Sequence, residues 1–134
     1  MKVLSVVVCH NLYYLLRNTL ESLLENFPFG DVVVVDNGST NQELIEYLRS
    51  RELSEPRLKV VFRSDNDETK RIGSLYEANN WAIEYSIENG YDYVCFVQDD
   101  VQYMWTDPNI MEKVAAIFDQ EQGVSNVSPA FLKK

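Results

Sequence analysis

Short runs of β-branched residues alternate with longer amphipathic stretches along this chain, and this alternation limits the possible folds more than any other feature. Residues 4–8 and 32–35 are nearly continuous valine, which is typical of strands buried on both faces of a parallel sheet. Apolar runs at 58–62 and 93–97 predict two further strands, and residues 124–127 predict a last, short one.

Between these runs, apolar residues recur at helical spacing, which predicts helices over residues 14–24, 40–48, 74–88 and 108–118. Thr40 and Glu43 fit a capping box that opens the second helix, and Pro108 lies in the first turn of the fourth. Asn89 and Gly90 are expected to end the third helix. We therefore expect a single α/β domain over residues 1–134, with a mainly parallel sheet and helices on both faces.

The net charge of −9 counts against nucleic acid as a partner, because a phosphate backbone requires clustered Lys and Arg. No apolar run approaches the ~20 residues of a transmembrane segment, and the first residues read as a strand rather than a signal peptide. Cys9 and Cys95 lie in predicted strands without a disulfide or metal-binding spacing. We expect a cytoplasmic protein, with peripheral attachment to a membrane left open.

Ligands of parallel sheets bind beyond the carboxyl ends of the strands, so the residues that follow each predicted strand are the candidates for a site. No G-x-G-x-x-G follows the first strand and the chain has no G-x-x-x-x-G-K-[ST], which argues against a dinucleotide site and excludes a P-loop. A phospho-acceptor domain would have acidic residues after the first strand, where this chain has Cys9 and His10. The candidate segments are Cys9-His10-Asn11, Asp36-Asn37-Gly38-Ser39, Arg63-Ser64-Asp65 and Gln98-Asp99-Asp100.

The adjacent carboxylates of Asp99 and Asp100 follow a strand of five apolar residues. Two such charges repel, so they require a cation or hydrogen-bond donors. Oxygen ligands suit Mg²⁺ or Mn²⁺, which also bind phosphate oxygens and water. A solvated turn whose acids cap the next helix is the alternative interpretation. A bridging metal would let this acidic chain bind a nucleotide.

Four segments in this order resemble the family 2 glycosyltransferases of the GT-A fold: VLSVVVCHN, LLRNTLESLL, VVVVDNGST and DYVCFVQDD. The resemblance extends over nearly the whole chain. It implies a Rossmann-like GT-A domain that binds a nucleoside-diphosphate sugar, of the uridine or thymidine type, with Mn²⁺ or Mg²⁺. It also implies inverting transfer of the sugar to an acceptor such as a glycan or a lipid-linked molecule.

The resemblance assigns the metal to Asp99 and Asp100, with Asp99 also reaching the ribose. This pair corresponds to the D-x-D-type element of the family, although Gln98 stands where a strict D-x-D has its first acid. A second D-x-D sequence, Asp65-Asn66-Asp67, lies in a charged stretch that we interpret as solvated loop. We therefore prefer the pair after the fourth strand as the metal site.

The nucleoside is assigned by the same resemblance to Cys9, His10, Asn11, Asp36 and Asn37. Asn37 stands where the family has an acid that reads the nucleobase edge, and an amide can also pair with a pyrimidine. His10 stands where the family often has tyrosine, so its ring could stack on the base. A loop histidine without a task is the alternative, and Cys9 is a small wall residue.

Arg71, which follows Lys70 and precedes Gly73, corresponds to basic residues that approach the diphosphate in the family. Pairing of these cations with acids of the same loop is equally compatible with the sequence. Asn79 and Asn80 correspond to an asparagine near the donor, and we nominate Asn80 together with Arg71.

The family's catalytic base and acceptor pocket follow the fifth strand, whereas this sequence stops at Lys134. We therefore expect the acceptor-side segment to be absent and nominate no catalytic base. The sequence leaves open whether the protein is a homo-oligomer and whether a partner chain supplies the acceptor-side segment. Two alternative functions also stay open: a non-catalytic nucleotide-sugar-binding or assembly module, and a metal-free α/β interaction domain.

Overall fold

The computed structural model describes residues 1–63 and 71–127, with the backbone alone described at 71–74. The chain divides into two compact units, residues 1–104 and 105–134. Within the described residues, the first unit contains four strands and three helices, and the second contains one helix. The elements are β1 (Val3–Cys9), α1 (Tyr13–Asn26), β2 (Asp31–Asn37), α2 (Gln42–Ser54), β3 (Leu58–Arg63), α3 (Arg71–Glu88), β4 (Tyr93–Val97) and α4 (Ile110–Gln120).

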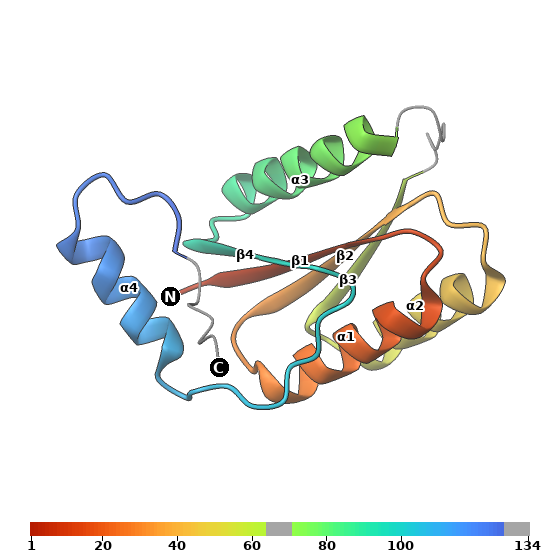
Figure 1. Ribbon diagram of the computed structural model, residues 1–134, viewed down its shortest axis with the longest axis horizontal. Coiled ribbons are helices and arrows are strands. Elements are labelled where there is room, and N and C mark those ends of the chain that lie inside the picture. Colours follow the sequence, from red (N-terminus) through yellow and green to blue (C-terminus); the bar gives the residue numbers. More distant parts are fainter. Residues whose placement is uncertain (64–70, 128–134) are drawn as a thin grey trace, which may run out of the picture. The chain divides into compact units, whose positions relative to one another are not determined.

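The four strands form one parallel sheet with the order β3-β2-β1-β4. The chain steps outward from β1 to β3 and then returns across the sheet to β4. Because parallel crossovers are right-handed, this reversal puts α1 and α2 on one face and α3 on the other (Figure 1). The predicted α/β class, with a parallel sheet and helices on both faces, is confirmed. The carboxyl ends of β1 and β4 border the point where the strand order reverses.

The core lies around the two central strands, which helices cover on both sides. Val32–Val35 are fully buried, as the near-continuous valine pattern predicts. On one face, Leu4 and Val6 pack with Ala78 and Ala82 of α3. Alternation of side chains along a strand sends the intervening residues to the face of α1 and α2. Leucines of these two helices are fully buried: Leu16, Leu20, Leu23, Leu44 and Leu48.

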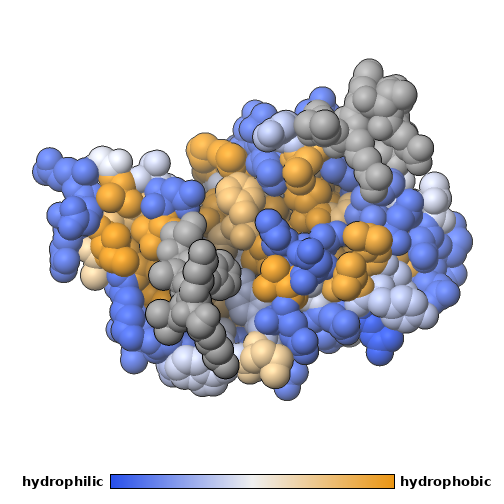
Figure 2. Space-filling view, viewed as in Figure 1, coloured by the Kyte–Doolittle hydropathy of each residue, from blue (hydrophilic) through white to orange (hydrophobic). Residues whose placement is uncertain are grey.

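β4 is an edge strand, and its side chains are less buried than those of the central strands β1 and β2. Phe96 pairs in register with Val6, so it lies on the α3 face, and its side chain is 54% exposed. Figure 2 shows apolar surface on the side of the first unit where β4 and α3 lie. None of the described helices combines the length and apolar character needed to cross a membrane.

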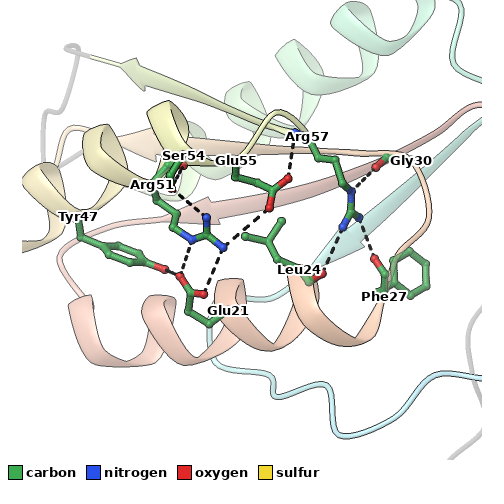
Figure 3. A network of polar contacts seen from close by, with 9 residues as sticks. All are labelled: Glu21, Leu24, Phe27, Gly30, Tyr47, Arg51, Ser54, Glu55 and Arg57. Atoms are coloured by element: carbon green, nitrogen blue, oxygen red, sulfur yellow. Dashed lines mark hydrogen bonds and ion pairs between the residues drawn. The ribbon is translucent and has the colours of Figure 1, made fainter.

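The partly buried side chain of Arg57 stabilises the amino-terminal end of the sheet. The guanidinium of Arg57 donates to the carbonyls of Gly30, Leu24 and Phe27 at 2.8, 3.2 and 2.9 Å (Figure 3). Two of these carbonyls belong to the end of α1, where helix carbonyls lack partners within the helix. Arg57 therefore fixes the chain reversal between α1 and β2.

Two predicted helix starts are wrong, and near the start of α2 the Oδ1 of Asn11 accepts from the backbone N–H groups of Thr40 and Asn41. Asn41, not Thr40, is the N-cap of α2, and its Oδ1 accepts from the backbone N–H of Leu44 at 3.1 Å. α4 begins at Ile110, so Pro108 precedes the helix instead of lying in its first turn.

Helices α2 and α3 are also longer than the spacing of apolar residues predicts. α2 continues past residue 48 to Ser54, and its last turns contain an Arg51–Glu55 pair at i,i+4 spacing. α3 begins at Arg71, three residues before the predicted start. Its predicted end is confirmed, with Gly90 at φ +71°.

The predicted last strand at 124–127 is wrong, since these residues have no regular structure. A strand is stable only when a neighbour pairs with its backbone groups. Within the described part of the chain, the sheet contains β1–β4 alone.

Candidate functional site

The carboxyl ends of β1, β2 and β4 bring three of the predicted segments to one edge of the sheet. Cys9 pairs with Asp36, and Val7 pairs with Val97 two residues before Asp99. Asp99 is near enough for its charge to help raise the pKa of Cys9, after burial and the charge of Asp36. The expectation that these strand ends share one edge is therefore confirmed.

Asp36 is 1% exposed, and its carboxylate organises the turn after β2. It accepts from the Ser39 backbone N–H at 3.0 Å, from the Ser39 hydroxyl and from the Cys9 thiol at 3.4 Å. Burial raises the pKa of Cys9 well above its usual value, so the thiol stays a donor. Asp36 and Cys9 thus bond to each other and to the turn. A direct nucleotide contact by either residue stays a prediction.

His10 and Asn37 lie side by side across the first two strand ends. The Nδ1 of His10 donates to the Asn37 carbonyl at 2.8 Å, because a carbonyl can only accept. Asn37 Oδ1 in turn accepts from Arg63 Nη1 at 3.2 Å. The base-binding candidates His10 and Asn37 are therefore joined by a direct hydrogen bond.

Arg63 is a site residue to which the sequence analysis gave no role. Besides Asn37, it contacts Glu77 of α3 through an Nη2–Oε2 distance of 3.0 Å. Its position at the end of β3 marked it as a candidate, but its partners lie 26 and 14 residues away. No local pattern in the sequence indicates that pairing.

Asp99 is half-buried and Asp100 is exposed. The pKa of Asp99 is raised, first by burial and then by the charge of Asp100. Neither carboxylate has a basic partner among the residues that the structure describes. In the same residues, no group of three or more His, Cys, Asp or Glu side chains could hold a metal ion. A cation here would therefore need further oxygen ligands from a bound molecule and water, as Mg²⁺ commonly does.

The segment after the acid pair is attached to α1. Asn26 Nδ2 donates to the Tyr103 carbonyl at 2.8 Å, and the Tyr103 N–H donates to Ser22 Oγ at 2.9 Å. The Tyr103 ring lies 5.8 Å from that of Phe27. These contacts hold the end of the loop beyond Asp99 and Asp100, and β4 precedes its start.

The predicted diphosphate residues are less closely associated with the strand ends. Asn80 is exposed and lies between Ala78 and Ala82 on the side of α3 away from the sheet, whereas Asn79 is half-buried. Arg71 is the first residue of α3, and its side chain is not among those described. Lys70 and the Asp65-Asn66-Asp67 sequence lie outside the described residues.

A cavity of about 200 Å³ lies at the amino-terminal edge of the sheet, away from these residues. It is lined in part by Asp31, Arg57, Lys59 and Tyr91. The Tyr91 hydroxyl donates to Asp31 at 2.6 Å, and Arg57 is bonded to three carbonyls. Because these polar groups are engaged with the protein itself, we assign no site there.

Asp99→Asn is expected to stabilise the metal-free protein at about pH 7 by less than about 1 kcal/mol, since the group is half-exposed. A carboxyl whose pKa is higher in the folded state binds its proton more tightly there, so its ionisation as pH rises destabilises the fold. The gain should shrink as pH falls through the raised pKa of folded Asp99 and should vanish below the ordinary aspartate pKa of about 3.9. Urea unfolding across this range measures it.

Asp119→Asn is the matched control, because Asp119 is an exposed carboxylate in α4. It should change stability little at any pH in the range. A loss of stability in Asp99→Asn at neutral pH, beyond that of the control, would contradict the repulsion between Asp99 and Asp100.

Comparisons with known proteins show the family of the chain and a similar fold. A model described as glycosyl transferase family 2 matches residues 5–128. A crystal structure of S. aureus TarS 1-349 is similar at 24% identity and a TM-score of 0.60, covering 90% of this chain and 33% of that one. The same protein in complex with UDP gives 22% identity and a TM-score of 0.58, covering 90% and 32%. This chain therefore spans about a third of those structures. The comparison with curated proteins gave no match.

Proposed function

Because this chain belongs to glycosyl transferase family 2 and has a Rossmann-like GT-A fold, we propose that it binds a nucleoside-diphosphate sugar for transfer to an acceptor. The observation that carries the proposal is the single sheet edge shared by the ends of β1, β2 and β4. An open parallel sheet binds ligands at this edge, where the strand order reverses.

The chemistry along the edge supports one orientation of the nucleotide. His10 and Asn37, at the ends of β1 and β2, offer an aromatic ring and an amide suited to a nucleobase. Asp99 and Asp100 follow β4, two strand spacings or about 10 Å from β2. We infer that the base lies toward β2 and the diphosphate toward β4.

The donor set of Asp99 and Asp100 fits Mg²⁺ or Mn²⁺, since both are oxygen ligands without a basic partner in the described chain. We propose that Asp100 binds the metal and that Asp99 also faces the ribose. A bound metal would supply charge neutralisation for the departing diphosphate. The protein residues hold and orient the nucleotide, and we assign no residue as the base that activates the acceptor.

Uridine diphosphate is the first probe, because the UDP complex of TarS has a similar fold. We expect it to bind with Mn²⁺ present, and we expect His10→Ala to weaken binding about tenfold through lost base stacking. Calorimetry measures the affinity, and thermal unfolding measures the stability. The substitution should lower the free energy of unfolding by less than it lowers the free energy of binding. Leu53→Ala is the control, since Leu53 is 90% exposed near the end of α2.

The outcomes of this experiment separate the candidate functions. Equal affinity in wild type and His10→Ala would remove His10 from the nucleoside site. A separate assay with nucleotide sugars reports hydrolysis or transfer, and binding without either would favour a non-catalytic nucleotide-sugar-binding module. No binding of any nucleotide would contradict the proposal as a whole.

A further inference from the structure

Asn11 is the one described non-glycine residue with a left-handed backbone, at φ +56°. Asparagine tolerates this conformation better than most residues, but it still carries a cost. Such strain persists only where surrounding contacts hold it, and it gathers at functional sites. Asn11 directly follows His10 at the proposed nucleoside site, so its strained backbone lies beside a residue proposed to contact the base.

The side chain of Asn11 is engaged almost wholly with the protein. Its Oδ1 accepts from the backbone N–H groups of Thr40 and Asn41 at 2.8 and 3.0 Å. Its own backbone N–H donates to Ser39 Oγ at 2.9 Å. These bonds attach the loop after β1 to the turn before α2. The carbonyl oxygen of the amide is therefore directed into the protein.

The amide nitrogen of Asn11 contacts the neighbouring imidazole. Nδ1 of His10 carries the proton donated to the Asn37 carbonyl, so Nε2 of the neutral ring is an acceptor. Asn11 Nδ2 lies 3.3 Å from Nε2 and can donate to it. Both ring nitrogens are thereby bonded to the protein, which fixes the plane of the ring and selects one tautomer.

We propose that Asn11 is a positioning residue that holds the His10 ring as its Nδ1–H tautomer, oriented for a nucleobase, and does not itself read the base. The part concerning the nucleobase rests on the proposed function. The part concerning the ring rests only on the hydrogen bonds of Asn11, His10 and Asn37. The two parts can therefore fail separately.

Two variants test this role. Asn11→Asp keeps an oxygen for Thr40 and Asn41 and tolerates the left-handed backbone, but it replaces the donor to Nε2 with an acceptor. Asn11→Gly also accepts the backbone conformation and removes every side-chain bond without adding charge. Thermal unfolding of both variants reports whether they fold.

The first readout is ¹⁵N NMR of His10 at about pH 8, where an ordinary histidine is neutral. The chain has a single histidine, so its ring signals are unambiguous. Wild type should show protonated Nδ1 and unprotonated Nε2. In Asn11→Asp, Nε2 should gain a proton in a measurable fraction of molecules, and Asn11→Gly should show a mixture of tautomers.

The second readout is the affinity for uridine diphosphate with Mn²⁺, which should fall about tenfold in both variants, as expected for one lost orienting bond. Because Asn11→Gly adds no charge, its loss cannot come from repulsion of the diphosphate. A wild-type ring signal in both variants would overturn the proposal as a whole, and wild-type affinity in both would overturn the part concerning the nucleobase. If wild type does not bind uridine diphosphate, the proposed function fails and the ring signals alone decide the role of Asn11.

Discussion

Asp100→Ala is expected to abolish metal-dependent binding of uridine diphosphate. The protein has a net charge of −9, so a diphosphate without a cation meets an unfavourable field. Loss of residues that only support metal ligands costs about 10- to 100-fold in metal affinity, so loss of a direct ligand should cost at least about a hundredfold. Calorimetry with and without Mn²⁺ measures the effect.

The same variant should fold at least as well as the wild type. Asp100 is exposed and its charge raises the pKa of Asp99, so its removal relieves a repulsion. Asp119→Ala in α4 is the control, since it removes an equally exposed acid from the other unit. Equal binding with and without Mn²⁺, or full binding by Asp100→Ala, would show that this carboxylate does not hold a metal.

Gly30→Ala is expected to cause the largest loss of stability, at least about 3 kcal/mol of the 5–15 kcal/mol typical of a domain. Gly30 has φ +67°, and a Cβ there would lie 2.0 Å from the backbone oxygen of Val3. The contact is with backbone of the central strand β1, so no flexible side chain can move aside. Denaturant unfolding monitored by circular dichroism measures the loss.

Gly90→Ala separates the two causes of that loss. Gly90 has φ +71°, but a Cβ there would meet nothing within 4 Å. This variant should therefore lose only the backbone term of about 1–2 kcal/mol. If Gly30→Ala were no worse than Gly90→Ala, the close approach of Gly30 to β1 would not limit stability.

The candidate residues at the ends of β1, β2 and β4 lie at the expected edge of the sheet, whereas their binding roles stay predictions. The strand-end residues could be chosen from sequence because parallel strands all end at one edge, and the structure has Cys9 beside Asp36 there. Their hydrogen bonds could not be chosen in that way. Arg63 contacts Asn37 and Glu77, and Asn11 reaches His10 and the turn before α2. These partners are distant in sequence and have no periodic pattern.

The sequence by itself determined the four strands, the approximate positions of the three helices between them and the end of α3 before Asn89 and Gly90. Burial on two faces, helical spacing and a left-handed glycine are properties of neighbouring residues, so they are visible in a short window. Only the tertiary structure decided where α2 begins. Asn11 bonds the backbone of Thr40 and Asn41, and Asn41 caps the helix.

The tertiary structure also decided that residues 124–127 form no strand, although their sequence resembles one. A valine-rich run becomes a strand only when another strand supplies hydrogen-bond partners, and that partner is not encoded in the run itself. Local preference therefore selected the elements of this protein. Contacts between residues distant in sequence decided which of those preferences were realised. They also decided which side chains meet at the carboxyl edge of the sheet.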